Sequence, residues 1–491
     1  MRREKNKKVL TWETRDFARV IAWFVFHCFL LTAGFIVILL ANAEFDLDVA
    51  WRFITTKGIT GSLIYLLIAT VLIAVGTFLY FYNENRDFIL QTKNVHLVFI
   101  LLEVSVAIMY LVGKYSVYAR PFALCALLSL LLIDKRTAVF MNTLCCFLMF
   151  MIDAFLLINP MESHLLYSSL IVGFSTSIFA VYLVNGTSSR LSVFLRGFVI
   201  SVPVIICILC LEFTAVLTAP LILVLSGFTS GMLSVVLMMA ILPVMERIFN
   251  VVTDYRLAEL TDHKSPLIKK LIEQAPGTFN HSLDVSTLAE SCATAIGENP
   301  ILARACAYYH DIGKLKQPNF FTENQSGYNP HNELTPELST DIIRSHTKDG
   351  YDLIKKYGLP KELADVACQH HGTLPIRYFY MKAKKFTEED LSLENFSYVG
   401  PKPRSKIAAI IMIADGCEAK VRTLPSRSHQ EVDNAVKEII EERMDFDQFA
   451  ECELTTKDIN IIRETLTNSL AGIYHDRVEY PKLKIGGNKN K

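Results

Sequence analysis

The stretch Tyr308-Tyr309-His310-Asp311-Ile312-Gly313-Lys314, "YYHDIGK", lies in the second half of this 491-residue chain. It ends the segment "PILARACAYYHDIG", whose apolar residues recur at spacings of three and four, as in an amphipathic helix. A histidine beside an aspartate at this point is either an ordinary helix end or the centre of a metal-dependent site that cleaves phosphate esters. The dipeptide alone does not decide, because such pairs occur by chance in many proteins.

The composition of the chain divides it into two halves. Overall, 52% of the residues are hydrophobic, 20% are charged, and the mean hydropathy is +0.32. Long apolar runs fill the chain from Val20 to about Val244, and ordinary globular composition follows from Glu246. We therefore predict a membrane domain over 1–244, joined to a soluble domain. The net charge of +0 gives no support for a nucleic-acid polymer as partner, and the cysteine pattern predicts reduced thiols without disulfides.

The apolar runs predict about eight membrane spans, because a helix needs about 20 apolar residues to cross a bilayer core of about 30 Å. The expected spans are 20–41, 60–82, 95–112, 117–133, 137–158, 165–184, 193–213 and 218–244. The first is predicted to be a retained helix rather than a signal peptide. The fourth is the weakest, since Arg120 and Pro121 shorten it. A helical hairpin with the fifth span and a merged or re-entrant segment are both open.

Lysine and arginine are concentrated at the N-terminus and in the second, fourth and sixth loops, which predicts a cytoplasmic N-terminus. An even number of spans then returns the C-terminal domain to the cytoplasm. Glu103 and Asp153 lie within predicted spans, with no obvious cation at matching depth. Ionisable groups at such positions are costly. A proton or ligand pathway, a water-exposed cavity and hydrogen bonding between helices are all open.

The rest of the chain reads as helical throughout, so the fold class is all-α. Residues 245–275 are predicted to be a helical linker, in which one helix continues the last span to Leu260 and another begins at Ser265-Pro266. "APG" at 275–277 ends that second helix. A helical domain over 276–482 and a disordered tail over 483–491 complete the prediction.

Six histidines and aspartates join His310 to form a candidate metal set. His281 is predicted to end a turn, His346 to lie within a helix, and the others to lie at the ends of successive helices. Imidazoles with a few carboxylates suit Zn, Fe, Mn or Ni. A shared aspartate can bridge two ions about 3.5–4 Å apart, an arrangement suited to in-line displacement at phosphorus. Lys314, about one turn past Asp311, is either a contact to a phosphoryl oxygen or a solvated surface lysine. The full set is His281, His310, Asp311, His346, His370, His371 and Asp415.

The order H…HD…H…HH…D resembles the HD phosphohydrolase superfamily. The segments "PGTFNHS", "YYHDIGKLKQPNFFTENQSGYNPHNELTPELSTDIIRSHTKDG", "QHHGT" and "YPK" resemble, more narrowly, the seven-transmembrane HD phosphodiesterases of the PgpH type. The resemblance implies hydrolysis of cyclic di-AMP to pApA with two divalent ions, iron or manganese. It implies that the candidate set holds these ions, with Asp311 as the bridge and His371 as a ligand or a phosphate contact. Asp311, Lys314 and His371 are then the expected catalytic residues.

The insert "FFTENQSGYNPHNEL" follows the His-Asp pair and offers aromatic and amide groups that can stack on or bond to adenine. The residues expected to contact substrate are Lys314, Tyr309, Phe321, Asn324, Asn329 and His331. The alternatives are a structural loop that fixes the metal helices and, for Tyr309, packing in the core. One departure from the family pattern is the short interval 42–59, where relatives typically carry a large extracytoplasmic domain.

Three other functions are open on the sequence. Cyclic di-GMP is disfavoured as substrate because "HHGTLPIRYFY" lacks the Gly-Tyr-Pro motif of the related HD-GYP enzymes. A hydrolase of a mononucleotide or of (p)ppGpp is also open, as is a receptor whose HD domain binds a nucleotide without cleaving it. The expected partners are cyclic di-AMP, the lipid bilayer and a second copy of the chain. The expected location is the bacterial cytoplasmic membrane, with several spans and a cytoplasmic catalytic domain.

Overall fold

The computed structural model describes residues 14–56, 59–156, 164–187, 189–212, 220–386 and 390–473. The chain forms two compact units, Met1–Tyr255 and Arg256–Lys491. Within the described residues both units are helical, and a single bridge between Pro375 and Ser397 is the one β-type pairing. The predicted all-α fold is therefore confirmed. The division falls inside the predicted linker, while the predicted tail 483–491 lies outside the described residues.

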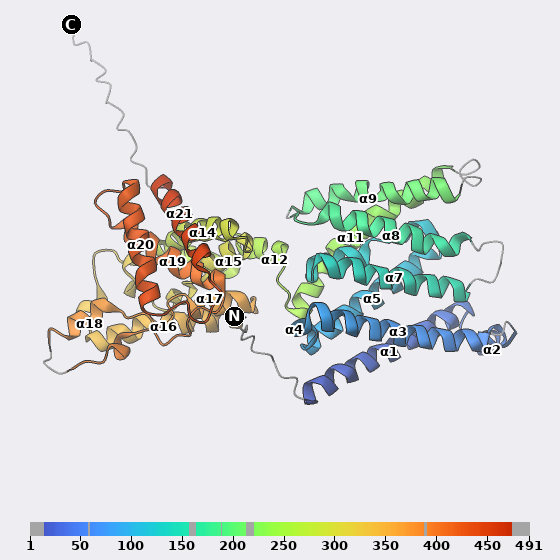
Figure 1. The fold of residues 1–491 in the computed structure, drawn as a ribbon, viewed down its shortest axis with the longest axis horizontal. Coiled ribbons are helices and arrows are strands. Elements are labelled where there is room, and N and C mark those ends of the chain that lie inside the picture. Colours follow the sequence, from blue (N-terminus) through green and yellow to red (C-terminus); the bar gives the residue numbers. More distant parts are fainter. Residues whose placement is uncertain are drawn as a thin grey trace, which may run out of the picture. The chain divides into compact units, whose positions relative to one another are not determined.

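The first unit is a set of long apolar helices (Figure 1). They are α1 (Thr14–Asn42), α2 (Leu47–Thr56), α3 (Ile59–Glu84), α4 (Arg86–Ile89), α5 (Thr92–Gly113), η1 (Val117–Ala119), α6 (Leu124–Leu132), α7 (Lys135–Leu156), α8 (His164–Val184), α9 (Arg190–Leu211) and α11 (Pro220–Phe249). Within the described residues, each predicted span falls on one of these helices, except the fourth, 117–133, which falls on η1 and α6. Six helices in the described part of the chain are long and apolar enough to cross a membrane. Two further apolar segments are shorter, Val117–Leu132 and Leu170–Val184.

The segment predicted as the fourth and weakest span, 117–133, nevertheless runs from one end of this unit to the other. Arg136, at the start of α7, pairs with Glu84 at the end of α3, and a short connection leads from there to the start of α5. At the opposite end, Arg120 lies against the last residue of α5 and pairs with Asp153 near the end of α7. Helices α5 and α7 therefore run in the same direction. Because α6 is only about 13.5 Å long, η1 and the residues around Pro121 supply the rest of the path.

Both acidic residues inside the predicted spans have basic partners, contrary to the expectation that none lies at matching depth. The Arg120 guanidinium donates to both carboxylate oxygens of Asp153, at 2.5 and 2.8 Å. Glu103 accepts a hydrogen bond from Nδ1 of His27 at 2.9 Å. The sequence concealed these pairs because the partners are 33 and 76 residues apart. Pairing offsets much of the cost of burying each charge.

We predict that Arg120→Leu will destabilise the membrane unit by about 3–5 kcal/mol, because it leaves the Asp153 carboxylate without its cation. The double replacement Arg120→Leu/Asp153→Leu should recover most of that loss. The matched control is Arg136→Leu, whose pair with Glu84 is 84% and 48% exposed and should be worth at most about 1 kcal/mol. Thermal unfolding of the full chain in detergent measures all three. Equal losses for Arg120→Leu and Arg136→Leu would contradict a structural role for the pair.

The linker is interrupted, so the predicted continuation of the last span to Leu260 is wrong. Helix α11 ends at Phe249, and Asn250 adopts the left-handed region with φ of +49°. A separate helix, α12 (Asp254–Leu260), follows. The second predicted start is confirmed: α13 (Pro266–Gln274) has Ser265 at its N-cap and proline at its first position.

The second unit packs its helices around the apolar helix α19 (Lys406–Arg422), of which Ala408–Ala414 are buried. Its remaining helices are α14 (Pro276–Ile296), α15 (Pro300–Tyr309), η3 (Ile312–Lys316), η4 (Pro318–Phe320), η5 (Thr322–Asn324), η6 (Pro330–Asn332), α16 (Pro336–Lys356), α17 (Lys361–Gln369), α18 (Arg377–Ala383), η7 (Leu393–Phe396), α20 (His429–Asp445) and α21 (Thr456–Ile473). Helices α14, α15 and α16 each start with proline, and in α15 and α16 the N-cap side chains of Asn299 and Thr335 also accept a backbone hydrogen bond. All 11 cysteines of the chain are free thiols, as predicted.

Candidate metal centre

Five segments of the second unit bring the predicted metal set together. His281 lies on α14, in its second turn rather than in the preceding turn as predicted. His310 and His370 are the C-terminal caps of α15 and α17, and His346 lies within α16. Asp415 lies within α19, which continues to Arg422 instead of closing at the aspartate. The seven side chains form two groups of possible ligands, Asp311 with His346, His370 and His371, and His281 with His310 and Asp415.

The Asp311 carboxylate lies between the two groups and faces both. Its Oδ1 is 3.3 Å from Nε2 of His346 and 3.5 Å from Nε2 of His370. Its Oδ2 is 3.3 Å from Nε2 of His310 and 3.9 Å from Nε2 of His281. One oxygen for each group is the geometry that a bridging carboxylate requires.

Hydrogen bonds to the backbone fix the ring orientation of three of the histidines. Nδ1 of His310, His346 and His370 donates to a carbonyl three residues earlier, at 2.7, 2.6 and 2.9 Å. In the neutral form of each ring, Nε2 then carries the lone pair, and this atom is directed into the cluster. The Nε2 atoms of His346 and His370 are only 3.3 Å apart, so two lone pairs face each other.

The donor atoms of this cluster fit a cation. Nε2 of His310 and Oδ1 of Asp311 are buried without a hydrogen-bond partner, although unsatisfied buried polar atoms are rare. Divalent ions in the two groups would satisfy these atoms and the facing lone pairs of His346 and His370. Imidazole and carboxylate donors suit Zn, Fe, Mn or Ni.

The electrostatics of the cluster also favour metal binding. Burial lowers the pKa of His370 to about 4 and holds the pKa of His371 well below its usual range, so both imidazoles are neutral at physiological pH. Burial alone raises the pKa of Asp311, but Lys314 and His310 outweigh it and hold that pKa well below the ordinary value. His370 and His371 are thus neutral imidazoles and Asp311 is an ionised carboxylate, which are the protonation states that metal ligands need.

Glu418 completes the environment of His281 and was not anticipated from the sequence. It lies one turn after Asp415 on α19, is fully buried, and accepts a hydrogen bond of 2.6 Å from Nδ1 of His281. Nε2 of the same ring faces Asp415 at 2.9 Å. Burial opposes protonation of this ring, but the two carboxylates raise the pKa of His281 to about 10. The spacing of three residues from Asp415 was a usable signal, because it places Glu418 on the same helix face.

Lys314 contacts the cluster through Asp311. Its Nζ lies 2.7 Å from Oδ2 of Asp311 and 2.8 Å from Oε1 of Glu323. Burial lowers the pKa of Lys314, but these two carboxylates outweigh it and raise that pKa above the ordinary value. The solvated-lysine alternative is excluded by this geometry. Lys314 reaches the cluster because a side-chain methyl at Gly313 would overlap the carbonyl of His346, so only glycine lets η3 pack this closely on α16.

The insert after the His-Asp pair is a series of short 3-10 turns held by internal bonds, as the structural alternative predicted. The Asn324 side chain bonds to the start of α14 at Thr278, and the side-chain Oδ1 of Asn329 accepts a hydrogen bond from the backbone amide of His331. His331 is buried and bonds to the Phe320 carbonyl at 2.9 Å. These three residues support the loop in this conformation.

Phe321 and Tyr309 were also predicted to contact substrate, and they lie in two different places, beside the cluster and in the core. Phe321 is buried and packs at the cluster, with its ring 5.6 Å from His346 and 4.9 Å from Nζ of Lys314. Tyr309 is fully buried, and its hydroxyl contacts Ser265 and Leu260 of the linker. Tyr309 thus packs in the core and presents no surface to a substrate.

The exposed side of the cluster is formed by His371 and Asp415, whose side chains are 22% and 15% exposed, while the other five ligand candidates are at most 6% exposed. Tyr398 stacks on His371 there, with ring centroids 4.3 Å apart, and its backbone amide donates to the Leu374 carbonyl. Tyr398 was missed because it follows an irregular segment without helical periodicity. A substrate would reach the cluster from this side.

A helical domain that surrounds a buried aspartate with histidines, following a polytopic apolar unit, defines a membrane-bound HD-domain protein. Residues 278–420 match the family described as "HD domain", and residues 60–253 match "7TM receptor with intracellular HD hydrolase". The chain belongs to this family of seven-transmembrane proteins with an HD domain. The described residues of the matched region 60–253 hold seven apolar segments, and α1 precedes them. The seven are α3, α5, η1 with α6, α7, α8, α9 and α11.

Individual relatives agree with this assignment. The chain is 35% identical over 468 residues to "Cyclic-di-AMP phosphodiesterase PgpH" of Bacillus subtilis, which covers 90% of this chain and 64% of that protein. It is 41% identical over 310 residues to the protein of the same name from Listeria monocytogenes, which covers 62% of this chain and 43% of that protein. The chain thus spans less than two thirds of the length of these relatives.

A crystal structure of the Listeria monocytogenes PgpH HD domain in complex with cyclic-di-AMP is also similar. It is 47% identical, covers 44% of this chain and 100% of that chain, and has a TM-score of 0.42.

We predict that Glu418→Gln will lower the metal affinity of the chain about 10- to 100-fold, because His281 loses the carboxylate that orients its ring. The matched control is Glu438→Gln, since Glu438 is a surface residue paired with Lys420, 73% exposed. Titration of the metal-free full chain with Mn²⁺, followed by calorimetry, measures both affinities. Unchanged affinity in Glu418→Gln would show that His281 needs no second carboxylate.

Proposed function

We propose that this chain is a membrane-bound, metal-dependent phosphodiesterase that hydrolyses cyclic di-AMP to pApA. The observation that carries the chemistry is the Asp311 carboxylate, shared between two groups of ligand atoms. The substrate is proposed from the 35% and 41% identical relatives named for this activity. The short interval between α1 and α3 leaves no large domain there, so regulation through such a domain is not part of the proposal.

We assign the ligands residue by residue from the geometry. One ion would be held by His346, His370 and His371, and the other by His281, His310 and Asp415, with Asp311 reaching both. Two divalent ions, iron or manganese, would activate a water molecule and neutralise charge on the phosphoryl oxygens. In the reaction, a water oxygen bonds to phosphorus, the bond to one 3′-oxygen breaks, and that oxygen takes up a proton.

The chain's own residues would position the substrate and keep the centre in the reactive state. Lys314 keeps Asp311 ionised and lies close enough to the cluster to meet a nonbridging oxygen of the phosphate. His371 and Asp415 line the exposed side, where Tyr398 provides a flat aromatic surface on which an adenine ring can stack. The remaining ligands exclude water, because they are almost fully buried.

The proposed location is the bacterial cytoplasmic membrane, with the HD domain in the cytoplasm. Three observations support it: the lysine and arginine bias of the loops, the crossing of the first unit by Val117–Leu132, and the word "intracellular" in the family description. Eight crossings return the chain to the side on which it starts. A homodimer stays a prediction.

We predict that the full chain in detergent with Mn²⁺ will convert cyclic di-AMP to pApA, and that Asp311→Ala will abolish turnover because both ions lose a ligand. Chromatographic product assays with cyclic di-AMP, cyclic di-GMP, (p)ppGpp and pApA identify the substrate. The control is Asp341→Ala, since Asp341 lies on α16 with a 56% exposed side chain. Binding of cyclic di-AMP without cleavage, in the presence of iron or manganese, would favour the receptor alternative. Faster cleavage of cyclic di-GMP or (p)ppGpp would contradict the proposed substrate.

A further inference from the structure

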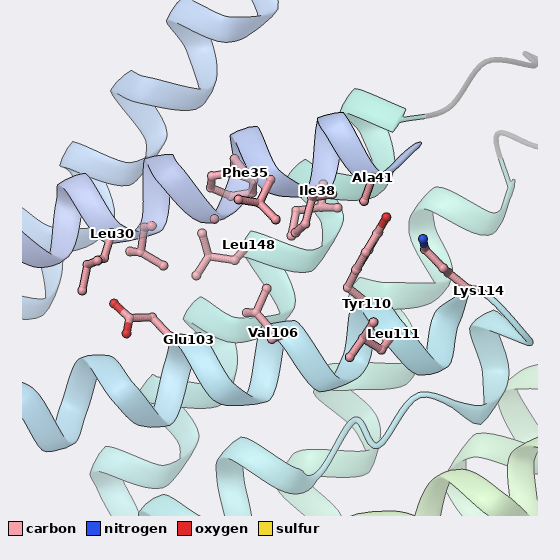
Figure 2. Close-up of a pocket in the computed structure, with 15 residues that line it drawn as sticks. Leu30, Phe35, Ile38, Ala41, Glu103, Val106, Tyr110, Leu111, Lys114 and Leu148 are labelled. Carbon is pink, nitrogen blue, oxygen red and sulfur yellow. The ribbon is translucent and has the colours of Figure 1, made fainter. Parts of the chain in front are cut away.

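A cavity of about 480 Å³ lies between α1 and α5 in the first unit, with α7 behind it (Figure 2). Its volume is within the range of sites that hold small organic ligands. Nearly all of the lining is apolar, and the polar groups lie at its two ends. The lining residues are Leu30, Leu31, Gly34, Phe35, Val37, Ile38, Ala41, Glu103, Val106, Ala107, Tyr110, Leu111, Lys114, Leu148 and Ile152.

The cavity opens sideways, as a groove between two helices that run in the same direction. On α1 its rim is formed by Leu30, Gly34 and Val37, which are exposed at helical spacing. On α5 the rim is formed by Ala107 and Leu111, also exposed. Gly34 leaves space, because no atom lies within 4 Å of the position where its side chain would begin. In a bilayer such a rim faces lipid chains.

The length of the groove along α5 is close to the thickness of the hydrocarbon layer of one leaflet. Figure 2 shows Glu103 at one end, and Ala41, Tyr110 and Lys114 at the other. Eleven residues of helix separate Glu103 from Lys114, a rise of about 16 Å. Half of a hydrocarbon core is about 15 Å. If Lys114 lies at head-group level, Glu103 therefore lies near the bilayer midplane.

The two ends differ in chemistry. At the Lys114 end, Nζ lies 5.1 Å from the Tyr110 ring, and the Tyr110 hydroxyl accepts a hydrogen bond from Asn42 at 2.9 Å. A lysine at the membrane surface attracts anionic head groups, by about 1 kcal/mol. At the deep end, Glu103 bonds to His27 at 2.9 Å, and His27 bonds to His96 at 3.0 Å. This partly buried polar chain reaches the deep end of the groove through Glu103.

We propose that this groove binds one acyl chain of an anionic glycerophospholipid, with its head group at Lys114 and its chain directed toward Glu103. The sideways opening admits a chain from the bilayer, the depth matches a single leaflet, and Lys114, the one cation among the described residues that line the groove, selects a negative head group. A bound chain fills the space between α1 and α5. The membrane unit thereby contains a site whose occupancy depends on the lipid composition around it.

The test uses the full chain in nanodiscs of phosphatidylcholine that contain a small fraction of phosphatidylglycerol with a photoreactive group in its acyl chain. We expect this probe to label peptides from α1 and α5 more strongly than a phosphatidylcholine probe does. Gly34→Leu, which fills the groove, should reduce that labelling roughly fivefold, equivalent to about 1 kcal/mol. Gly76→Leu is the matched control, because Gly76 on α3 also has no atom within 4 Å of its side-chain position and does not line the groove.

The selectivity of the mouth is tested separately with Lys114→Gln. This variant should lose the preference for phosphatidylglycerol, about fivefold, whereas Lys93→Gln at the other end of α5 should retain it. Equal labelling by both probes in the unsubstituted chain would overturn the proposal and show only nonselective contact with the bilayer. Labelling that is unchanged in Gly34→Leu would place the lipid elsewhere. Should Gly34→Leu fail to fold, the two lysine variants decide.

Discussion

The arrangement of the second unit depends on one buried carboxylate, that of Asp311. It is 1% exposed and faces the imidazoles of four histidines from α14, α15, α16 and α17. A buried carboxylate without partners would cost several kcal/mol. Here Lys314 and the surrounding imidazoles offset that cost, and the pKa of Asp311 stays well below its usual range. Each helix that contributes a histidine is thereby tied to the same point.

The local structure around Asp311 follows from this constraint. Helix α15 stops at Tyr309, so that His310 caps it and Asp311 turns inward. Gly313 then lets η3 pack against the backbone of α16, which brings Asp311 to His346. The insert with Phe321 packs over this junction, and Glu323 shares Lys314 with Asp311. The loop that sequence reasoning considered as a substrate contact is thus also a support of the metal centre.

Much of the site was predictable, because its residues are chemically distinctive and keep a characteristic order. The seven candidate ligands were named from the order of histidines and aspartates along successive predicted helices, and the structure brings all seven together. Glu418 and Tyr398 were missed for a physical reason: they act on ligand rings instead of forming part of the motif. Tyr309 was named because it is adjacent to the motif, but helical geometry turns it into the core.

In the membrane unit, too, the sequence predicted local features but not the contacts between distant segments. Apolar runs located every described span, since hydrophobic length is a local property of the sequence. The pairing of Arg120 with Asp153 joins segments 33 residues apart, and only packing reveals it. The break after Phe249 depends on one residue, Asn250, in a left-handed conformation, which the helical periodicity of the linker did not show.

The central claim is that Asp311 unites two metal positions into one reactive centre. Its most direct test is to add Mn²⁺ stepwise to the metal-free full chain and to measure bound metal and cleavage of cyclic di-AMP in the same samples. The account predicts that two ions bind per chain, that cleavage appears only as the second ion binds, and that the electron paramagnetic resonance spectrum then shows two coupled ions. Full activity with a single bound ion, or two ions without magnetic coupling, would contradict it.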